Sequence, residues 1–299
     1  MRAGVIDIGT NSTRYLVADI DREGTVSRVE TALKTTRLGE GVASTGRLSE
    51  QAMARTTAAV AGFWRRTREI GAETVLLVAT CAVREARNRE DFLALIHQAT
   101  GLQVRVLSGR EEACYNFAGV LTGCDVNPAK AAVVDVGGGS TEIIWVENER
   151  LVARSLPLGA VRLTEQQAGF EVIESYLGPV CRLISGRQLF GTGGTITTLA
   201  AVALGLPDYN PDLVHGYQLS ASEVSALISR FAGFSLDELK EVPGLQPERA
   251  DIIVAGARIV MGLLNIAGAS SLTVSENDIL YGIAAEAAGT VERKISYKC

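Results

Sequence analysis

Two stretches of this chain have nearly the same design: an apolar strand that ends in an acid, a glycine turn, and a second apolar strand. Residues 4–20 read GVIDIGTNSTRYLVADI and residues 133–146 read VVDVGGGSTEIIWV, with Asp7 and Asp135 in matching places. Each stretch predicts a β-hairpin, because apolar runs flank a turn of glycine and polar side chains. A chain of 299 residues is long enough for two domains of roughly 150 residues each. The repeat therefore predicts two related α/β units.

The elements around the two hairpins follow the same order in both halves. In the first half we expect strands at residues 5–8, 15–20, about 24–33, 74–79 and 103–107, and helices over 49–70, from 82 and from 108. In the second half we expect strands at 133–136, 143–147, 151–157, 188–191 and 272–275, and helices from 163, from 193, over 252–267 and from about 278. This alternation indicates hairpin sheets extended by parallel crossovers. We place the domains at residues 1–120 and 121–299, with the last helix able to pack back on the first domain.

Composition excludes several classes of protein. A net charge of -5 and a pI near 5.3 argue against nucleic acid as a partner, since proteins that bind nucleic acids carry a broad basic face. The chain shows no basic and apolar leader, and Arg258 and Asn265 interrupt the apolar segment 252–267, so we expect neither a signal peptide nor a membrane span. Five scattered cysteines favour reduced thiols and a cytoplasmic protein.

The two turns have the chemistry of phosphate-binding loops. Glycine tolerates positive φ, so several backbone N–H groups can converge on one anion, and hydroxyl side chains add donors without bulk. One such hairpin alone is also compatible with a purely structural turn. Two copies that face each other across a cleft would grip successive phosphates. The residues that we expect to contact phosphate in these loops are Gly9, Thr10, Asn11, Ser12, Gly137, Gly138, Gly139, Ser140 and Thr141.

The acids beside these loops are candidate metal ligands. A buried carboxylate without a partner costs several kcal/mol, so something cationic should compensate it. Mg²⁺ prefers carboxylate oxygens together with phosphates and waters. We therefore expect Asp7, Asp135 and Glu142 to hold Mg²⁺, directly or through water. The alternative is that an aspartate caps its own turn.

A third glycine loop, which contains Gly193, Gly194 and Thr195, lies between a predicted strand and a predicted helix. The N-terminus of that helix could bind phosphate through its backbone N–H groups. The glycines could equally allow the helix to pack closely on the sheet. The sequence leaves both readings open.

The chain resembles the exopolyphosphatase and guanosine pentaphosphate phosphohydrolase family, within the superfamily of actin, sugar kinases and heat-shock ATPases. The resemblance extends from residue 5 to about 284, and implies two ribonuclease H-like α/β domains with a cleft between them. Its motifs are DIGTNSTR (7–14), RLGEG (37–41), ATCAVREARN (79–88), SGREEA (108–113), VVDVGGGSTE (133–142), GTGGTITTLAA (191–201), VHG (214–216) and ERADIIVAGA (248–257). Thr13 and Cys81 depart from the family pattern, which commonly has Phe and Ser there.

The resemblance implies a catalytic acid in the SGREEA motif, best matched by Glu112 with Glu111 as the alternative, and a catalytic Arg84. Taken alone, two glutamates at a helix start also fit a pair that complements the helix dipole. The resemblance further implies that Arg14, Lys34 and Arg37 guide an anionic substrate. Arginine suits this role because its guanidinium group binds phosphate through two hydrogen bonds.

The activity that the resemblance implies is hydrolysis of the terminal phosphoanhydride of inorganic polyphosphate. The alternatives are guanosine pentaphosphate hydrolysis, an ATP-dependent kinase or ATPase, and a protein that binds the alarmone without catalysis. The implied cofactor is Mg²⁺, with Mn²⁺ and a monovalent cation as further candidates. A homodimer is compatible with the resemblance, although no interface is legible in the sequence.

Overall fold

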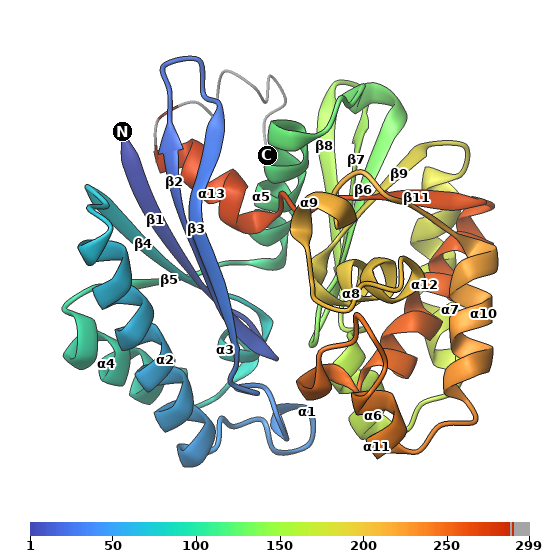
Figure 1. Cartoon of the computed structure of the whole chain (residues 1–299), viewed down its shortest axis with the longest axis horizontal. Helices are drawn as coiled ribbons and strands as arrows, with labels where there is room; N and C mark the ends of the chain where they lie inside the picture. The colour runs from blue at the N-terminus through green and yellow to red at the C-terminus, as the bar shows by residue number, and fades with distance from the viewer. Residues whose placement is uncertain (288, 290–299) are drawn as a thin grey trace.

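Two β-sheets lie side by side in the computed structural model, which describes residues 1–287 and residue 289 (Figure 1). The first sheet has the strand order β3-β2-β1-β4-β5, and the second has the order β10-β11-β9-β6-β7-β8. The strands of the first sheet are β1 (Arg2–Ile8), β2 (Ser12–Ile20), β3 (Val26–Thr35), β4 (Thr74–Ala79) and β5 (Val104–Val106). Those of the second are β6 (Ala131–Val136), β7 (Thr141–Glu147), β8 (Arg150–Leu156), β9 (Gln188–Thr192), β10 (Gln218–Ser220) and β11 (Ser271–Val274).

Both sheets are built on one plan. Strands β1, β2 and β3 pair antiparallel, and β4 and β5 extend the sheet in parallel from β1. Strands β6, β7 and β8 repeat the antiparallel part, and β9 and β11 repeat the parallel part. The registers match as well, because Asp7 lies opposite Arg14 in the first hairpin and Asp135 lies opposite Glu142 in the second. The expected fold class, two ribonuclease H-like α/β units, is confirmed.

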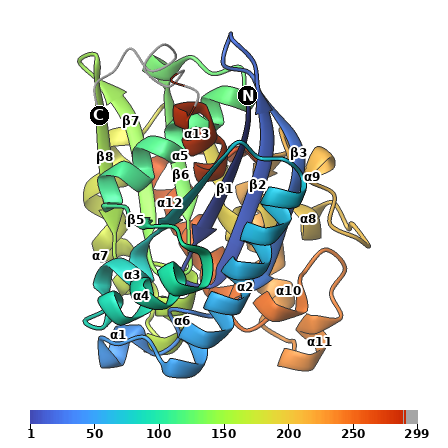
Figure 2. The ribbon, with the colours of Figure 1, turned by 90° about the vertical axis from the view of Figure 1, so that its left-hand side faces the viewer.

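Helices α2 (Glu50–Glu69) and α4 (Arg89–Thr100) cover the outer face of the first sheet (Figure 2). The start of α2 follows the sequence pattern, because the Ser49 side chain accepts a hydrogen bond from the Ala52 N–H. The helix expected from residue 82 is present as α3 (Cys81–Glu85), which ends before α4 begins at Arg89. Between them the Asn88 side chain bonds the backbone N–H and carbonyl of Leu48, which holds the chain away from a helical path.

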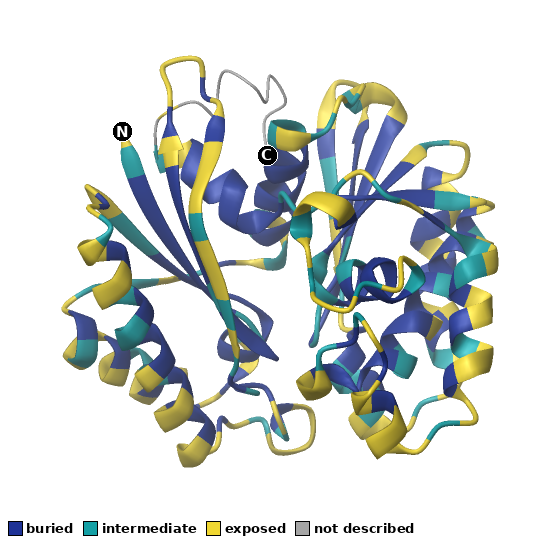
Figure 3. Ribbon diagram, in the orientation of Figure 1, coloured by how far each residue is buried: buried dark blue, intermediate teal, exposed yellow. Residues whose placement is uncertain are grey.

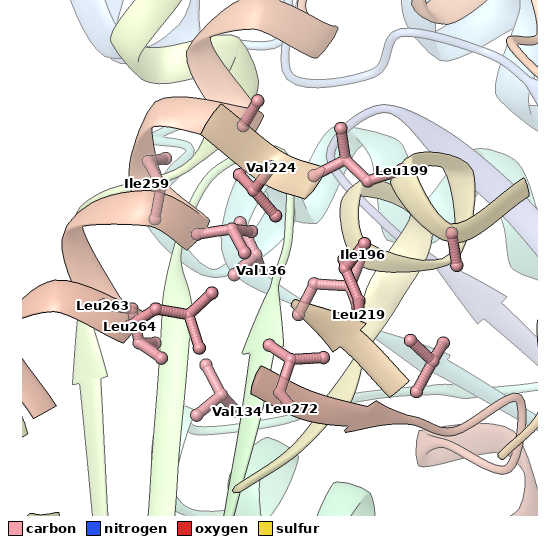
Figure 4. Packing of buried hydrophobic residues seen from close by; sticks show 14 of the residues in the cluster. Val134, Val136, Ile196, Leu199, Leu219, Val224, Ile259, Leu263, Leu264 and Leu272 are labelled. Atoms are coloured by element: carbon pink, nitrogen blue, oxygen red, sulfur yellow. The ribbon is translucent and has the colours of Figure 1, made fainter. Parts of the chain in front are cut away.

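The second sheet is covered on one face by α7 (Phe170–Cys181), α8 (Gly193–Ala203), α10 (Ala221–Phe231) and α12 (Ile253–Ala267). Figure 4 shows side chains from α8, α10 and α12 together with Val134 and Val136 of the sheet. The expected buried helix over 252–267 is α12. Among the described residues, no helix is both long and apolar enough to cross a membrane.

The remaining elements are short connections. Sequence patterns missed β10, α10 and α11, although Ser220 with Glu223 and Ser235 with Glu238 form the capping boxes that signal the two helices. The short connecting elements are α1 (Val42–Thr45), α6 (Ala160–Gln166), α9 (Pro211–Val214), α11 (Leu236–Lys240) and the 3₁₀ turns η1 (Pro128–Lys130), η2 (Arg182–Ile184) and η3 (Pro247–Arg249).

Two buried helices, α5 (Gly109–Gly123) and α13 (Ile279–Ala287), lie between the sheets (Figure 3). Helix α5 packs on the second sheet and α13 packs on the first, so each half contributes a helix to the core of the other. The helices approach closely, since a Cβ at Gly119 would overlap the Asp278 carbonyl and one at Gly282 would overlap the Tyr115 carbonyl. The boundary at residue 120 stays a prediction.

The cysteines differ in state. Cys81, Cys124 and Cys181 are free thiols, and Cys114 is disulfide-bonded. Cys299 lies outside the described residues. The expectation of reduced thiols therefore holds for three cysteines and is wrong for Cys114.

Candidate functional site

A cavity of about 340 Å³ lies between the two halves, where strands β1, β6 and β9 end. All three predicted glycine loops line it. The first two loops meet directly, because a Cβ at Gly138 would lie 3.4 Å from Cβ of Thr10 and one at Gly139 would lie 2.7 Å from Thr10 Oγ1. The two hairpins thus share one groove. The loop residues at its surface are Gly9, Thr10, Asn11, Ser12, Gly137, Gly138, Gly139, Ser140, Gly193, Gly194 and Thr195.

The two hairpin turns close in the same way. The Gly9 N–H donates to the Ser12 carbonyl at 3.1 Å, and the Gly137 N–H donates to the Ser140 carbonyl at 3.0 Å. Thr141, by contrast, does not line the cavity, because its hydroxyl is buried and donates to the Leu158 carbonyl at 2.5 Å. The repeated sequence therefore produces a repeated turn, with Thr141 in a supporting position behind it.

The glycines of the third loop admit two charged side chains to the cavity. Gly193 has φ 86°, and a Cβ there would overlap Oδ1 of Asp135. A Cβ at Gly194 would overlap the guanidinium group of Arg249. The sequence left open phosphate binding and close packing as reasons for these glycines. The structure adds a third reason: glycine leaves room for Asp135 and Arg249 beside the N-terminus of α8.

Asp7, at the end of β1, is buried against Arg14. Nη2 of Arg14 lies 2.8 Å from Oδ2 of Asp7, and the same guanidinium group also pairs with Asp278 at the start of α13. Burial raises the pKa of Asp7, and the charge of Arg14 opposes that rise. Oδ1 of Asp7 is buried without a hydrogen-bond partner. Asp7, Arg14 and Asp278 all line the cavity.

Asp135, at the end of β6, has a neutral partner in place of an arginine. Nδ2 of Asn116 donates to Oδ2 of Asp135 at 2.7 Å, and Oδ1 of Asp135 is buried without a partner. Burial raises the pKa of Asp135 to about 6. Glu142 is buried behind it, accepts a hydrogen bond from Ser155 Oγ at 2.6 Å, and does not line the cavity. Burial, together with the charges of Glu112 and Asp135, raises the pKa of Glu142 well above its usual range.

The two adjacent glutamates of α5 occupy different environments. Glu112 lines the cavity, is 7% exposed, and pairs with Nη1 of Arg84 at 2.8 Å. Burial raises the pKa of Glu112 to about 7. Glu111 lies outside the cavity, where it forms a capping box with Ser108 and pairs with Arg105 at 2.7 Å. The helix-capping reading thus fits Glu111, and the cavity-facing acid is Glu112.

The predicted cations are not all brought together. Arg84 reaches the site through Glu112 without lining the cavity. Lys34 and Arg37 lie outside it: Nζ of Lys34 sits 5.8 Å from the centre of the Phe63 ring, and Arg37 pairs with Asp251 at 2.8 Å. Phe63 belongs to α2 on the outer face of the sheet, so the Lys34 side chain points away from the cavity.

Sequence reasoning missed Arg249 as a site residue. Its side chain lines the cavity, is 8% exposed, and lies 3.5 Å from Ser12 Oγ. Burial, with the nearby charge of Arg14, lowers the pKa of Arg249 to about 10. Among the described residues no carboxylate forms an ion pair with it. Arg249 was visible in the ERADIIVAGA motif, but its burial was not.

The donor set at the cavity suits a divalent cation shared with a ligand. No three His, Cys, Asp or Glu side chains of the described residues could enclose a metal ion by themselves. Asp7 and Asp135 each present one buried carboxylate oxygen without a partner. Such oxygens fit Mg²⁺, which commonly keeps several waters and binds one or two carboxylates plus substrate phosphates. Glu142 could act only from behind Asp135.

Comparison with known proteins gives one consistent relationship. The chain is 34% identical to exopolyphosphatase 2 of Mycobacterium tuberculosis, over 96% of this chain and 99% of that protein. It is 28% identical to exopolyphosphatase 1 of Mycobacterium bovis, over 87% of this chain and 80% of that one. Among solved structures, the Ppx/GppA family member of Aquifex aeolicus has 31% sequence identity and a TM-score of 0.81, with 96% of this chain and 97% of that chain covered.

The model of the Ppx/GppA phosphatase family matches residues 16–287, which includes the second half of β2, both glutamates of α5, the second hairpin and α13. Together with a relative of 34% identity along almost its whole length, this match settles the family. The chain belongs to the Ppx/GppA phosphatase family.

Proposed function

We propose that this protein is a Mg²⁺-dependent exopolyphosphatase that releases orthophosphate from the end of inorganic polyphosphate. The observation that carries the proposal is the position of Glu112. This buried acid, with its pKa raised to about 7, lines the same cavity as two mirrored phosphate-type loops. A base of that pKa is suited to accept a proton from water near neutral pH. The exopolyphosphatases among the relatives support the substrate class.

The charge of the cavity supports a cation requirement. Its lining carboxylates outnumber its arginines, so a polyanion meets net negative charge unless a cation enters with it. A divalent cation held by these carboxylates would supply positive charge that offsets this repulsion. The carboxylates are Asp7, Glu112, Asp135, Glu276 and Asp278, and the arginines are Arg14, Arg28 and Arg249.

In the proposed reaction, the two loops hold the terminal phosphoryl group between their backbone N–H groups and hydroxyls. Glu112 accepts a proton from a water molecule as the water oxygen bonds to phosphorus. The bond between phosphorus and the bridging oxygen breaks, the electron pair stays on the shortened chain, and orthophosphate leaves. Arg249 and the loop N–H groups stabilise the charge on the phosphoryl oxygens. Asp7 and Asp135 would hold Mg²⁺, which would supply positive charge to offset the charge of the phosphate oxygens.

Guanosine pentaphosphate is the second candidate substrate, and one feature of the cavity favours it. The cavity is also lined by Tyr209, Tyr281 and Glu276, and the Tyr209 hydroxyl donates to Glu276. Aromatic rings can stack on a base, and a carboxylate can accept hydrogen bonds from the N–H groups of guanine. Both substrates end in a phosphoanhydride, so the same Glu112 chemistry would serve both.

The test is a phosphate-release panel with long polyphosphate, tripolyphosphate, guanosine pentaphosphate and ATP, each with and without Mg²⁺. We expect release from polyphosphate that requires Mg²⁺ and needs no ATP. Turnover of ATP that depends on an added acceptor would instead indicate a kinase. Tight binding of the guanosine nucleotide without any release would indicate a protein that binds the alarmone without catalysis.

A further inference from the structure

Asn116 is a buried amide that the catalytic proposal leaves unused. It lies on α5 four residues after Glu112, so the two side chains share one face of the helix. Asn116 is 0% exposed, and its Nδ2 donates to Oδ2 of Asp135 at 2.7 Å. The other atom of the amide, Oδ1, is buried without a partner. The side chain therefore connects the helix of Glu112 to the end of β6.

Asn116 is a poor choice for stability alone. A buried polar atom without a hydrogen-bond partner costs about 1–3 kcal/mol. Asn116 buries such an oxygen, and the interaction made by its other end is with the similarly strained carboxylate of Asp135. Apolar residues surround it on α5, where Ala113, Phe117 and Val120 pack on the second sheet. An apolar residue would suit that surrounding better, so the amide needs another explanation.

The hydrogen bond determines which oxygen of Asp135 is available. Oδ2 is held by Asn116, so the carboxyl group cannot rotate without breaking that bond. Oδ1 then lies against Gly193, which lines the cavity. The amide thus keeps one carboxylate oxygen at the cavity and the other behind it.

The neutrality of the amide matters as much as its hydrogen bond. In the first half the corresponding Asp7 is held by the positive charge of Arg14 at 2.8 Å. An arginine next to Asp135 would orient it equally well but would repel a metal ion. A leucine would supply no donor, and an aspartate would add repulsion between carboxylates. An amide orients Asp135 without placing a positive charge directly beside it.

We propose that Asn116 is a positioning residue that directs Oδ1 of Asp135 toward the divalent cation of the cavity. This inference rests on the proposed function, which supplies the cation. Groups that orient a metal ligand in this way typically change metal affinity about 10- to 100-fold when they are removed. Glu112 and Asn116 both lie on α5, so the hydrogen bond from Asn116 to Asp135 also fixes the position of Glu112 relative to Asp135.

The test compares Asn116→Leu with the wild-type protein in direct binding of Mn²⁺, followed by electron paramagnetic resonance with inorganic phosphate present. We expect Mn²⁺ to bind about 10- to 100-fold more weakly to the variant. Phosphate release should fall at limiting Mg²⁺ and recover most of the way at saturating Mg²⁺. The matched control is Asn88→Leu, which removes another buried asparagine whose partners are the Leu48 backbone atoms, and which should bind Mn²⁺ like the wild type.

Asn116→Ser, which retains a shorter hydrogen-bond donor, serves if Asn116→Leu does not fold by circular dichroism, and is expected to weaken Mn²⁺ binding in the same direction. An unchanged Mn²⁺ dissociation constant in the folded variant overturns the inference and leaves the proposed function standing. A loss of activity that saturating Mg²⁺ does not restore also overturns it. A wild-type protein that binds no Mn²⁺ overturns the metal requirement of the proposed function and the inference with it.

Discussion

The two hairpins differ in what faces the acid. In the first, the residue across from Asp7 is Arg14, and the two form an ion pair at 2.8 Å. In the second, the residue across from Asp135 is Glu142, and a neutral amide holds the carboxyl group instead. The backbone turns close with the same hydrogen bond, whereas the groups that hold the two acids differ. Asp7 and Asp278 share the positive charge of Arg14, whereas among the described residues no arginine forms an ion pair with Asp135.

The largest expected effect is the loss of the base in Glu112→Gln. We expect turnover to fall by about 10²- to 10⁴-fold with substrate binding retained, because the amide cannot accept a proton. Glu111→Gln is the matched control, since Glu111 caps α5 outside the cavity. Phosphate release and calorimetric binding check both variants. If Glu111→Gln loses turnover and Glu112→Gln keeps it, the assignment is off by one residue.

The asymmetry of the acids is tested by Asp135→Asn against Asp7→Asn. We expect Asp135→Asn to raise the Mg²⁺ concentration for half-maximal activity by more than about tenfold. Asp7→Asn should change the Mg²⁺ requirement less and lower the free energy of unfolding more, because breaking a buried ion pair costs about 3–5 kcal/mol. Arg14 keeps its second partner, Asp278, and this reduces the loss. Mg²⁺ titrations and thermal melts measure the two effects. Equal Mg²⁺ responses would show that the halves share the metal evenly.

A substitution of Arg249 tests whether the second half also contributes a residue that binds the anionic substrate. Arg249→Met should raise KM for polyphosphate by about 10- to 100-fold, since a charge-assisted hydrogen bond contributes about 1.5–3 kcal/mol. The variant should also melt at a higher temperature, because a buried cation without a carboxylate partner is removed. Arg37→Met is the control, as Arg37 pairs with Asp251 outside the cavity. A similar rise in KM for Arg37→Met would restore the role that the sequence predicted for it.

The smallest expected effect is the change of the free energy of unfolding with pH. The folded-state pKa values of Glu112 and Asp135, about 7 and about 6, lie above those of unfolded chains. The folded protein therefore binds more protons between about pH 4 and 7, and its free energy of unfolding falls as the pH rises through that window. Without metal we therefore expect the free energy of unfolding to be lower at pH 8 than at pH 5. Denaturant titrations of Glu112→Gln should show a shallower fall; an identical slope would assign the effect to other groups.

Much of the fold was legible because its signals are local. Alternating apolar runs and glycine turns predicted the strands of both hairpins, the parallel strands that follow them, and α12. The shared groove followed from the repetition itself. Glu112 was identified with Glu111 as its rival, and the separation came only from geometry, because neighbours on a helix point in different directions.

The features of the site that could not be predicted from the sequence depend on contacts between residues far apart in the chain. The direction of Lys34 depends on which face of β3 meets the cleft. Arg249 looks like a surface charge until Gly194 and Ser12 enclose it. The amide of Asn116 looks like an interruption of an apolar helix until Asp135 is placed beside it. Each of these assignments needs a partner more than 15 residues away in the chain.

The exchange of α5 and α13 between the sheets has a consequence for biosynthesis. The inner face of the first sheet, with Ala3, Val5 and Leu16, is covered by residues 279–285. These residues are synthesised long after β1 and β2, so that face of the sheet stays without this helix while the intervening chain is made. Contacts between such distant segments are slow to form. A nascent chain that has completed only its first 120 residues would therefore expose an apolar surface of the kind that chaperones bind.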